Sequence, residues 1–343
     1  MKFSVRVNND LSFAELLALA VAAEQAGFDQ LWVSNDLFLR SAPVLMGALA
    51  AGTARIGLGI AVMNPYSVHV SELAMVAATL QEVSGSRFLL GLGAGSEQFL
   101  GWAGLTRAQP LATTRTALVG LRALLGHQDV DRELLPEWFG PASVLRFPLA
   151  RPVPVYIGAM GPKMLEMAGR HADGVLPLLY PPERYASVRL QVLAGAEHGR
   201  PEHGRRDVDL PACFWVSLSD DPVQARTALA EKLAYYGPSI SAPVLAAAGL
   251  RPQDFAAAAR LAHDGHGAAQ LIDDRMLSLG VAGDVADVLA RCRVLGQLGA
   301  RHLSFGPPLG PDPVAAIRLL GKQVLPALTQ LTETGPTEIK EEA

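Results

Sequence analysis

Residues 1–34, MKFSVRVNNDLSFAELLALAVAAEQAGFDQLWVS, contain a strand–helix–strand unit that decides how the rest of the chain is interpreted. Residues 3–7 alternate apolar and polar side chains, which is the pattern of a β-strand. Ser12 and Glu15 have the spacing of a capping box, so an amphipathic helix is expected to begin there. Residues 30–34 then predict a second strand.

The same alternation continues along the chain. Alternating strands and helices predict a parallel sheet, and eight such units favour a closed barrel over an open doubly wound sheet. We therefore expect an α/β fold, a (β/α)8 TIM barrel with insertions. The expected strands are 3–7, 30–34, 55–63, 87–92, 153–157, 174–178, 208–217 and 302–305. The expected helices are 12–27, 43–51, 69–83, 113–125, 162–172, 182–197, 221–236, 284–298 and 312–328.

A length of 343 residues would also suit two average domains, but a single barrel domain over residues 1–328 fits the unbroken alternation. Two stretches interrupt it: a polar, proline-containing excursion at 127–149 and an insertion rich in Ala, Gly and Pro at about 238–281. The acidic tail, 329–343, is expected to be disordered.

Composition argues against several classes of protein. The net charge of -4, without a basic cluster, argues against a nucleic-acid partner. No uncharged apolar run is long enough to cross a bilayer, and no signal-peptide core follows the first strand. Cys213 and Cys292 lie in apolar runs outside any CxxC pair and are expected to be buried free thiols. These features predict a cytoplasmic protein.

The sequence contains no motif for a metal site or for a serine hydrolase. No histidine pair has the spacing of metal ligands, so no metal is expected. No GxSxG elbow is present to support Ser/His/Asp hydrolysis.

In a (β/α)8 barrel the chemistry lies at the C-terminal ends of the strands. Gly91-Leu92-Gly93-Ala94-Gly95 follows the fourth strand. A dinucleotide fingerprint needs its third glycine one residue later and a helix that starts at once, whereas here a loop to Pro110 is expected. We interpret the run as backbone that passes close to a ligand at the barrel mouth.

The stretch Gly158-Ala159-Met160-Gly161-Pro162-Lys163 joins the fifth strand to a helix. Pro162 suits the first helical position, and the glycines let a phosphate approach the N–H groups at the helix N-terminus. A plain tight turn remains the alternative. Among polar residues at the strand ends, Asp36 and Glu97 supply carboxylates, and Arg6 lies on the first strand.

These residues, taken in order, resemble the methylene-tetrahydromethanopterin reductases of the luciferase-like superfamily. The resemblance runs from residue 1 to about 328. It rests on Met1-Lys2-Phe3, Gly27-Phe28, Trp32, Gly59, Asn64-Pro65-Tyr66, Gly91 to Gly95, Gly158 to Met164, Ala172-Asp173-Gly174, Gly306 and Gly310-Pro311-Asp312.

The resemblance implies a (β/α)8 barrel, a homodimer, a small-molecule substrate and coenzyme F420 as hydride carrier. It implies a non-prolyl cis peptide between Ala61 and Val62, forming a bulge that backs the coenzyme ring. The loop from Gly158 to Lys163 would hold the coenzyme's phosphate. The cofactor-binding residues implied are Ala61, Val62, Asn64, Gly93, Ala94, Gly95, Gly158, Ala159, Met160, Gly161, Pro162, Lys163 and Tyr180.

Three polar positions depart from the reductases. Those enzymes usually carry Glu where this chain has Arg6, Asp-His where it has Asn35-Asp36, and Asp where it has Ser96. The scaffold for the cofactor is kept while residues facing the substrate differ, which indicates the same cofactor class with a different substrate or reaction.

The catalytic residues are therefore expected among Asp36, Glu97 and Arg6. Asp36 or Glu97 would move the proton, and Arg6 would anchor an anionic group of the substrate. An FMN-dependent monooxygenase and a barrel that binds a ligand without catalysis remain alternatives. The expected dimer interface lies on the apolar helices around 46–50 and 73–80.

Overall fold

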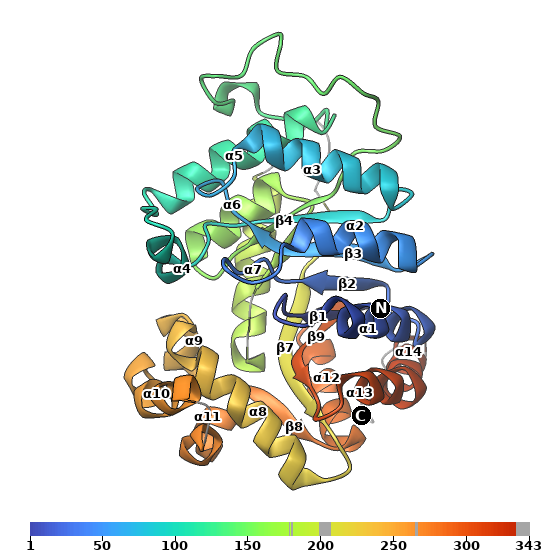
Figure 1. Cartoon of the computed structure of the whole chain (residues 1–343), viewed down its shortest axis with the longest axis vertical. Helices are drawn as coiled ribbons and strands as arrows, with labels where there is room; N and C mark the ends of the chain where they lie inside the picture. Colours follow the sequence, from blue (N-terminus) through green and yellow to red (C-terminus); the bar gives the residue numbers. More distant parts are fainter. Residues whose placement is uncertain (178, 180, 199–206, 265–266, 334–343) are drawn as a thin grey trace, which may run out of the picture.

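Nine strands form one parallel sheet in a computed structural model that describes residues 1–177, 179, 181–198, 207–264 and 267–333 (Figure 1). The order across the sheet is β6-β5-β4-β3-β2-β1-β9-β7-β8, and every neighbouring pair is parallel. The strands are β1 Lys2–Val7, β2 Gln30–Val33, β3 Gly57–Met63, β4 Phe88–Leu92, β5 Val155–Gly158, β6 Gly174–Leu176, β7 Pro211–Leu218, β8 Gly280–Gly283 and β9 His302–Leu309.

The sheet curls until its edge strand β6 meets the segment that leads into β7. Val175 N–H donates to the Asp209 carbonyl oxygen over 2.8 Å, and Asp209 N–H donates to that of Asp173 over 3.0 Å. The eight expected strands are all present within a residue or a few. The prediction of eight was short by one, because β8 pairs with the far half of β7 (Trp215 with Gly280, Leu218 with Gly283) and was assigned to the insertion.

Helices follow the strands and cover the outer face of the sheet (Figure 1). They are α1 Phe13–Gln25, α2 Ala42–Gly52, α3 Val70–Val83, α4 Glu97–Trp102, α5 Pro110–Leu124, α6 Pro162–His171, α7 Pro182–Glu197, α8 Pro222–Tyr236, α9 Ala242–Ala247, α10 Ala256–Asp264, α11 Asp274–Leu277, α12 Val285–Gln297, α13 Pro313–Leu319 and α14 Leu325–Glu333. A π-helical turn, Leu320–Val324, joins α13 to α14, so the last helix extends past the expected end at 328.

Side-chain caps fix where several of these helices begin. The capping box of Ser12 and Glu15 is confirmed: each side chain accepts from the other residue's backbone N–H. The Asp221 carboxylate accepts from Val223 N–H over 2.9 Å at the start of α8. Such caps supply acceptors to N–H groups that the first turn leaves without an intrahelical partner.

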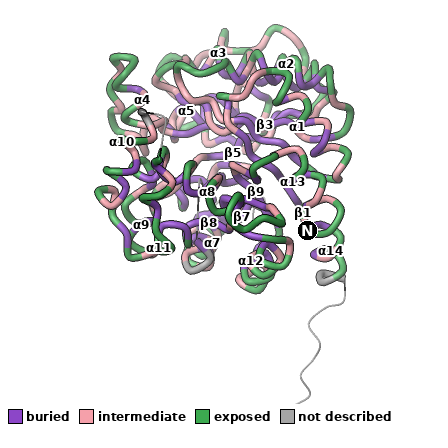
Figure 2. The backbone as a smooth tube through the Cα atoms, turned by 60° about the horizontal axis from the view of Figure 1, so that its bottom comes forward, coloured by how far each residue is buried: buried purple, intermediate pink, exposed green. Residues whose placement is uncertain are grey.

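The core has two parts, one on each face of the sheet. A large cluster lies between the sheet and the surrounding helices, and in Figure 2 the buried trace runs through the strands and the inner helical faces. A smaller cluster of Trp32, Leu89, Tyr156 and Leu176 fills the concave side. Cys213 and Cys292 are buried and unbridged, as expected.

The insertion is helical rather than irregular. Helices α8 to α11 group beside β7 and β8 (Figure 1), with Leu229, Leu233 and Phe255 fully buried among them. The insertion therefore has apolar packing of its own, next to the strand ends where the site was expected.

The dimer interface expected on the helices around 46–50 and 73–80 stays a prediction, but only part of each helix is on the surface. Met46, Leu49 and Leu73 are 0% exposed, because their side chains pack between the sheet and its helices. Residues already buried within one chain cannot form a surface for a second copy. The large apolar side chains exposed on these two helices are Val44 of α2 and Met75 and Val83 of α3, of which Met75 lies within the expected interface.

Candidate functional site

The end of β3 leaves two side chains only partly covered beside the small cluster that contains Trp32 and Tyr156, and this uncovered place at the strand ends is called the hollow below. β3 lies between β2 and β4, yet Ala61 and Val62 are only half-buried, whereas Leu58 and Ile60 are buried. The peptide between Ala61 and Val62 is cis, as the resemblance implied, and the register against β4 shifts there. Nothing else in the described chain covers this point of the strand completely.

Glycines directly after β4 and at the end of β5 make room for the Val62 side chain. A Cβ at Gly93 would lie 2.8 Å from Val62 Cγ2, and one at Gly158 would lie 3.0 Å from Val62 Cγ1. Real Cβ atoms essentially never come within 3.0 Å of another atom, so a side chain at Gly93 would displace Val62. Gly93 and Gly158 thus leave the space that Val62 occupies. The sequence prediction for Gly91 to Gly95, backbone that passes close to a ligand, did not include this role.

The segment after Gly95 differs from the expected loop. Ser96 is the N-cap of α4, and its Oγ accepts from Phe99 N–H over 3.4 Å. A helix therefore starts immediately after the GxGxG run. The third glycine still stands one residue too early for a dinucleotide fingerprint.

Glu97 lies on the outer side of α4. Its side chain is 79% exposed and pairs with Arg107 over 2.8 Å. Arg107 also donates to the Gly95 carbonyl oxygen over 3.1 Å, so the pair fixes the loop. Glu97 is thus placed in solvent, with an ion-pair partner of its own.

Asn64 closes the turn after β3. Its Oδ1 accepts from Tyr66 N–H over 3.1 Å and from Ser67 N–H over 2.9 Å, and the residue is buried. This accounts for the turn that the Asn-Pro-Tyr sequence indicated.

The loop before α6 stands open at its glycine. Within 4 Å of a Cβ built on Gly161 there is no other heavy atom, and Lys163 in the first turn of α6 is exposed. Ala159, by contrast, is buried. The predicted site residue Tyr180 lies outside the described residues.

A second group of residues is polar and comes from β1, the loop after β2 and β9; it is called the polar side of the hollow below. Arg6 is buried, and a Cβ at Gly306 would lie 2.9 Å from its Nη2 and 2.8 Å from Trp215 Cδ1. Asp36 follows β2, and Ser34 Oγ lies 3.3 Å from its Oδ2. Burial raises the pKa of Asp36, and the Ser34 hydrogen bond and the charge of Lys232 only partly oppose this.

Helix α8 adds two side chains that sequence reasoning missed. Lys232 Nζ lies 4.1 Å from the centroid of the Tyr236 ring. Tyr236 Oη accepts from Asn8 Nδ2 over 3.0 Å and also interacts with the Asp36 carboxyl group. Nothing in the sequence places the end of this helix beside β1 and β2. The sequence shows only that Lys232 and Tyr236 are four residues apart.

A cavity of about 540 Å³ lies on the other side of Asn8 and Lys232, between α8, the end of β1 and the turn from β9 to α13. Its walls are mainly apolar, with Leu11, Pro307 and Pro308 among them. It adjoins the polar side of the hollow and does not include the loop before α6.

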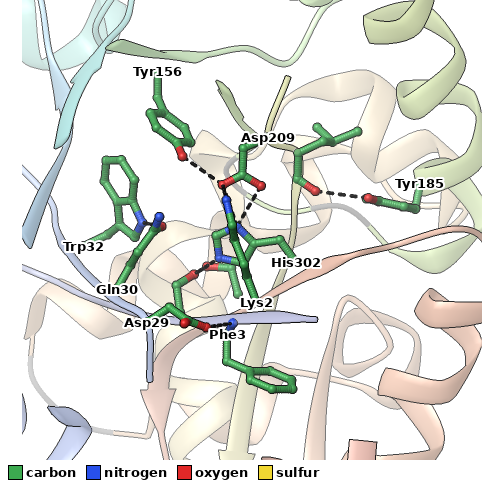
Figure 3. A network of polar contacts seen from close by, with 12 residues as sticks. Lys2, Phe3, Asp29, Gln30, Trp32, Tyr156, Tyr185, Asp209 and His302 are labelled. Atoms are coloured by element: carbon green, nitrogen blue, oxygen red, sulfur yellow. Dashed lines mark hydrogen bonds and ion pairs between the residues drawn. The ribbon is translucent and has the colours of Figure 1, made fainter. Parts of the chain in front are cut away.

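Below the hollow, a buried polar network crosses the concave side of the sheet (Figure 3). His302 Nδ1 lies 3.0 Å from both Asp209 carboxylate oxygens, and His302 Nε2 lies 2.9 Å from Ser4 Oγ. Tyr156 Oη donates to Asp209 over 2.8 Å. The order Asp–His–Ser is that of a hydrolase triad, but Ser4 is 0% exposed, so no substrate reaches it.

Charge governs Asp209 more than burial does. Burial disfavours its ionised form, but the hydrogen bond and charge of His302, with Lys2 and Tyr156, lower its pKa to about 2. Asp209 is therefore an ionised carboxylate held by hydrogen bonds within this network.

Residues 1–302 match the family described as luciferase-like monooxygenase. The chain belongs to the luciferase-like family. A 5,10-methylenetetrahydromethanopterin reductase of Methanolobus tindarius is 32% identical over 310 residues, which cover 89% of this chain and 94% of that protein. An F420-dependent glucose-6-phosphate dehydrogenase of Nakamurella multipartita is 29% identical over 336 residues, 94% of each chain.

A solved luciferase-like structure gives the same picture. Coenzyme F420 dependent tetrahydromethanopterin reductase from Methanopyrus kandleri matches with a TM-score of 0.82 and 25% identity, over 95% of this chain and 99% of that one. The family resemblance expected from the ordered motifs is thus confirmed.

Two further findings concern the described part of this luciferase-like chain. No helix in it is long and apolar enough to span a membrane. No group of three His, Cys, Asp or Glu side chains in it is arranged to hold a metal ion.

Proposed function

We propose that this chain is an oxidoreductase that transfers hydride between coenzyme F420 and a small organic substrate. The observation that carries the proposal is the division of the hollow into two unlike sides. One side has the Val62 bulge seated on Gly93 and Gly158 and leads to the start of α6; the other carries Asp36 and Arg6. Two relatives that are named for different substrates are both named as F420-dependent, which supports a shared coenzyme with a variable substrate.

The residues present fit the coenzyme. The flat deazaflavin ring needs an apolar surface without protruding side chains. The half-exposed Ala61 and Val62 supply such a surface, and Gly93 and Gly158 leave room for Val62 to hold its position. A phosphate needs N–H donors and positive charge, and the open Gly161 followed by α6 and Lys163 offers both. When bound, the deazaflavin supplies the carbon that gives or takes the hydride.

The polar side would hold the substrate. Arg6 keeps its charge and binds carboxylates or phosphates in a forked geometry, so we assign it an anionic group of the substrate. Asp36 is assigned the proton that accompanies hydride transfer, since it is half-buried beside Arg6's strand. Glu97 is the weaker candidate because of its exposure and its pairing with Arg107.

Three finer assignments belong to the same proposal. Strands β1 to β7 and β9 would form the (β/α)8 barrel, with β8 added beside β7, which the bridge between Gly174 and Asp209 supports. The active form would be a homodimer. The buried, unbridged Cys213 and Cys292 support a cytoplasmic location.

The test is anaerobic turnover by the full chain with F420, using alcohols, aldehydes and imines that carry a carboxylate or phosphate. The expected result is a change in deazaflavin absorbance that depends on both enzyme and substrate. Turnover that instead requires FMN and oxygen would identify a monooxygenase. Failure to bind either coenzyme would leave a ligand-binding barrel.

A further inference from the structure

Lys232 and Tyr236 come from α8, the helix that follows β7, and both act on the Asp36 carboxyl group. They are four residues apart, so they lie on the same face of the helix. The Lys232 ammonium stands 4.1 Å from the Tyr236 ring centroid, within the range of a cation–π contact. The Tyr236 ring in turn packs edge-on against Trp215, with centroids 6.1 Å apart.

The Tyr236 hydroxyl has a defined direction for its proton. Asn8 Nδ2 donates to Tyr236 Oη over 3.0 Å, which leaves the phenol free to donate its own hydrogen. The acceptor beside it is the Asp36 carboxyl group. Burial, followed by the charges of Asp36 and Asp10, raises the pKa of Tyr236, so the phenol keeps its proton.

The backbone of Asp36 is held separately from its side chain. Asn9 is 0% exposed; its Oδ1 accepts from Asp36 N–H over 3.2 Å and from Ser34 Oγ over 2.8 Å, and its Nδ2 donates to the Asp36 carbonyl oxygen over 3.0 Å. The loop after β2 is thus fixed to the end of β1. The Asp36 carboxyl group is contacted separately, by Ser34 Oγ and by the side chains of α8.

We propose that Tyr236 and Lys232 are positioning residues that hold the Asp36 carboxyl group ready to exchange a proton with the substrate. This inference rests on the role that the proposed function gives to Asp36. Helix α8 would then complete the polar side of the site, in addition to packing beside β7 and β8.

All the charged groups around Asp36 enter its pH dependence. Burial raises its pKa most; Ser34, Lys232 and Tyr236 lower it, and Asp10 raises it. Lys232 itself has a pKa lowered to about 8, by burial and by Arg6, against the opposite effect of Asp10 and Asp36. Removing either α8 side chain therefore takes away a group that favours the carboxylate.

The experiment compares the pH dependence of kcat/KM for the full-length enzyme with that of Tyr236→Phe and Lys232→Met. Loss of the phenol or of the cation moves the acidic limb to higher pH, by about one unit. Lys232→Arg keeps a cation and should restore the original profile. Glu231→Gln, a neighbouring exposed position on α8, should leave the profile unchanged.

A second readout does not depend on turnover. Carboxyl NMR titration, with Asp36→Asn used to assign the Asp36 signal, should show the same displacement in both variants without substrate. If the titration moves and no F420 turnover is found in any form, the positioning role stands and the proposed function fails. An Asp36 titration that is identical in wild type, Tyr236→Phe and Lys232→Met overturns the inference. Tyr236→Phe keeps the ring against Trp215, so this variant is expected to fold.

Discussion

Asp36 and Asp209 are both largely removed from water, but their surroundings favour opposite protonation states. Asp209 is surrounded by His302, Lys2 and Tyr156, which favour its carboxylate. Asp36 has weaker compensation, so burial prevails and its pKa rises. A carboxyl group that gains and loses a proton closer to neutral pH suits acid–base work, whereas a permanently ionised one suits structure.

Asp36→Asn tests the first of these roles. Turnover with F420 and the true substrate should fall by at least about 100-fold, the lower bound for loss of general acid–base help. Coenzyme affinity should stay the same, because Asp36 lies on the opposite side of the hollow from Val62. Stopped-flow hydride transfer and a coenzyme titration measure the two effects. Normal turnover would remove Asp36 from the mechanism.

Asp209 makes stability depend on acid. Its folded pKa of about 2 lies below the ordinary 3.8, so its contribution is fully present above about pH 4 and is lost as pH falls toward 2. The difference corresponds to roughly 2 kcal/mol. Urea unfolding between pH 5 and about 2.5 should show a steeper loss of stability for wild type than for Asp209→Asn. Parallel curves for the two proteins would refute this role.

The sequence predicts Asp36 and Arg6 as site residues because strand ends converge in a parallel α/β fold. It cannot predict Lys232 and Tyr236, because their position depends on how α8 packs against the ends of β1 and β2. Glu97 was predicted as a site residue because it is close to a strand end, but closeness in sequence does not determine which way a side chain faces. Ser96 caps α4, and Glu97 in the first turn of that helix faces solvent.

At the level of elements, capping residues and apolar periodicity suffice to predict most strands and helices. The missed strand β8 has the sequence Gly-Val-Ala-Gly, which has no strand signal of its own. It is extended because Trp215 to Leu218 of β7 offer it hydrogen-bonding partners. Helix α4 is missed because its six residues are too few to show a period.

Gly93→Ala tests the seat of the β3 bulge. The new methyl group would lie 2.8 Å from Val62 Cγ2, so Val62 must shift and disturb the wall that it forms with Ala61. Coenzyme affinity should fall, while Gly101→Ala on α4, which has open space around it, should bind normally. Isothermal titration of both variants makes the comparison. Equal affinities would mean that the wall does not contact the coenzyme.

Gly161→Asp tests the start of α6. Because a Cβ here meets no other atom within 4 Å, Gly161→Ala is a steric control and the aspartate differs mainly by charge. A carboxylate at a helix N-terminus repels the phosphate that this turn is proposed to bind. Coenzyme binding should be lost in Gly161→Asp and kept in Gly161→Ala. Retained affinity in a folded Gly161→Asp protein would move the phosphate elsewhere.

For the molecule as a whole, the curled parallel sheet brings sequence-distant residues to one hollow. Val62 is on β3, Gly158 is on β5 and Gly93 directly follows β4, while Arg6 is on β1, Asp36 follows β2 and Tyr236 ends α8. The parallel alternation made this convergence predictable. The ninth strand and the helical insertion were not, since both depend on contacts between distant segments.

The central claim is that F420, rather than FMN, is the coenzyme of this hollow. Equilibrium titration of the purified full-length chain with each coenzyme, followed by fluorescence, tests it most directly. The account predicts saturable binding of F420 at one site per chain and no saturable binding of FMN in the same range. Saturable binding of FMN without binding of F420 would contradict it.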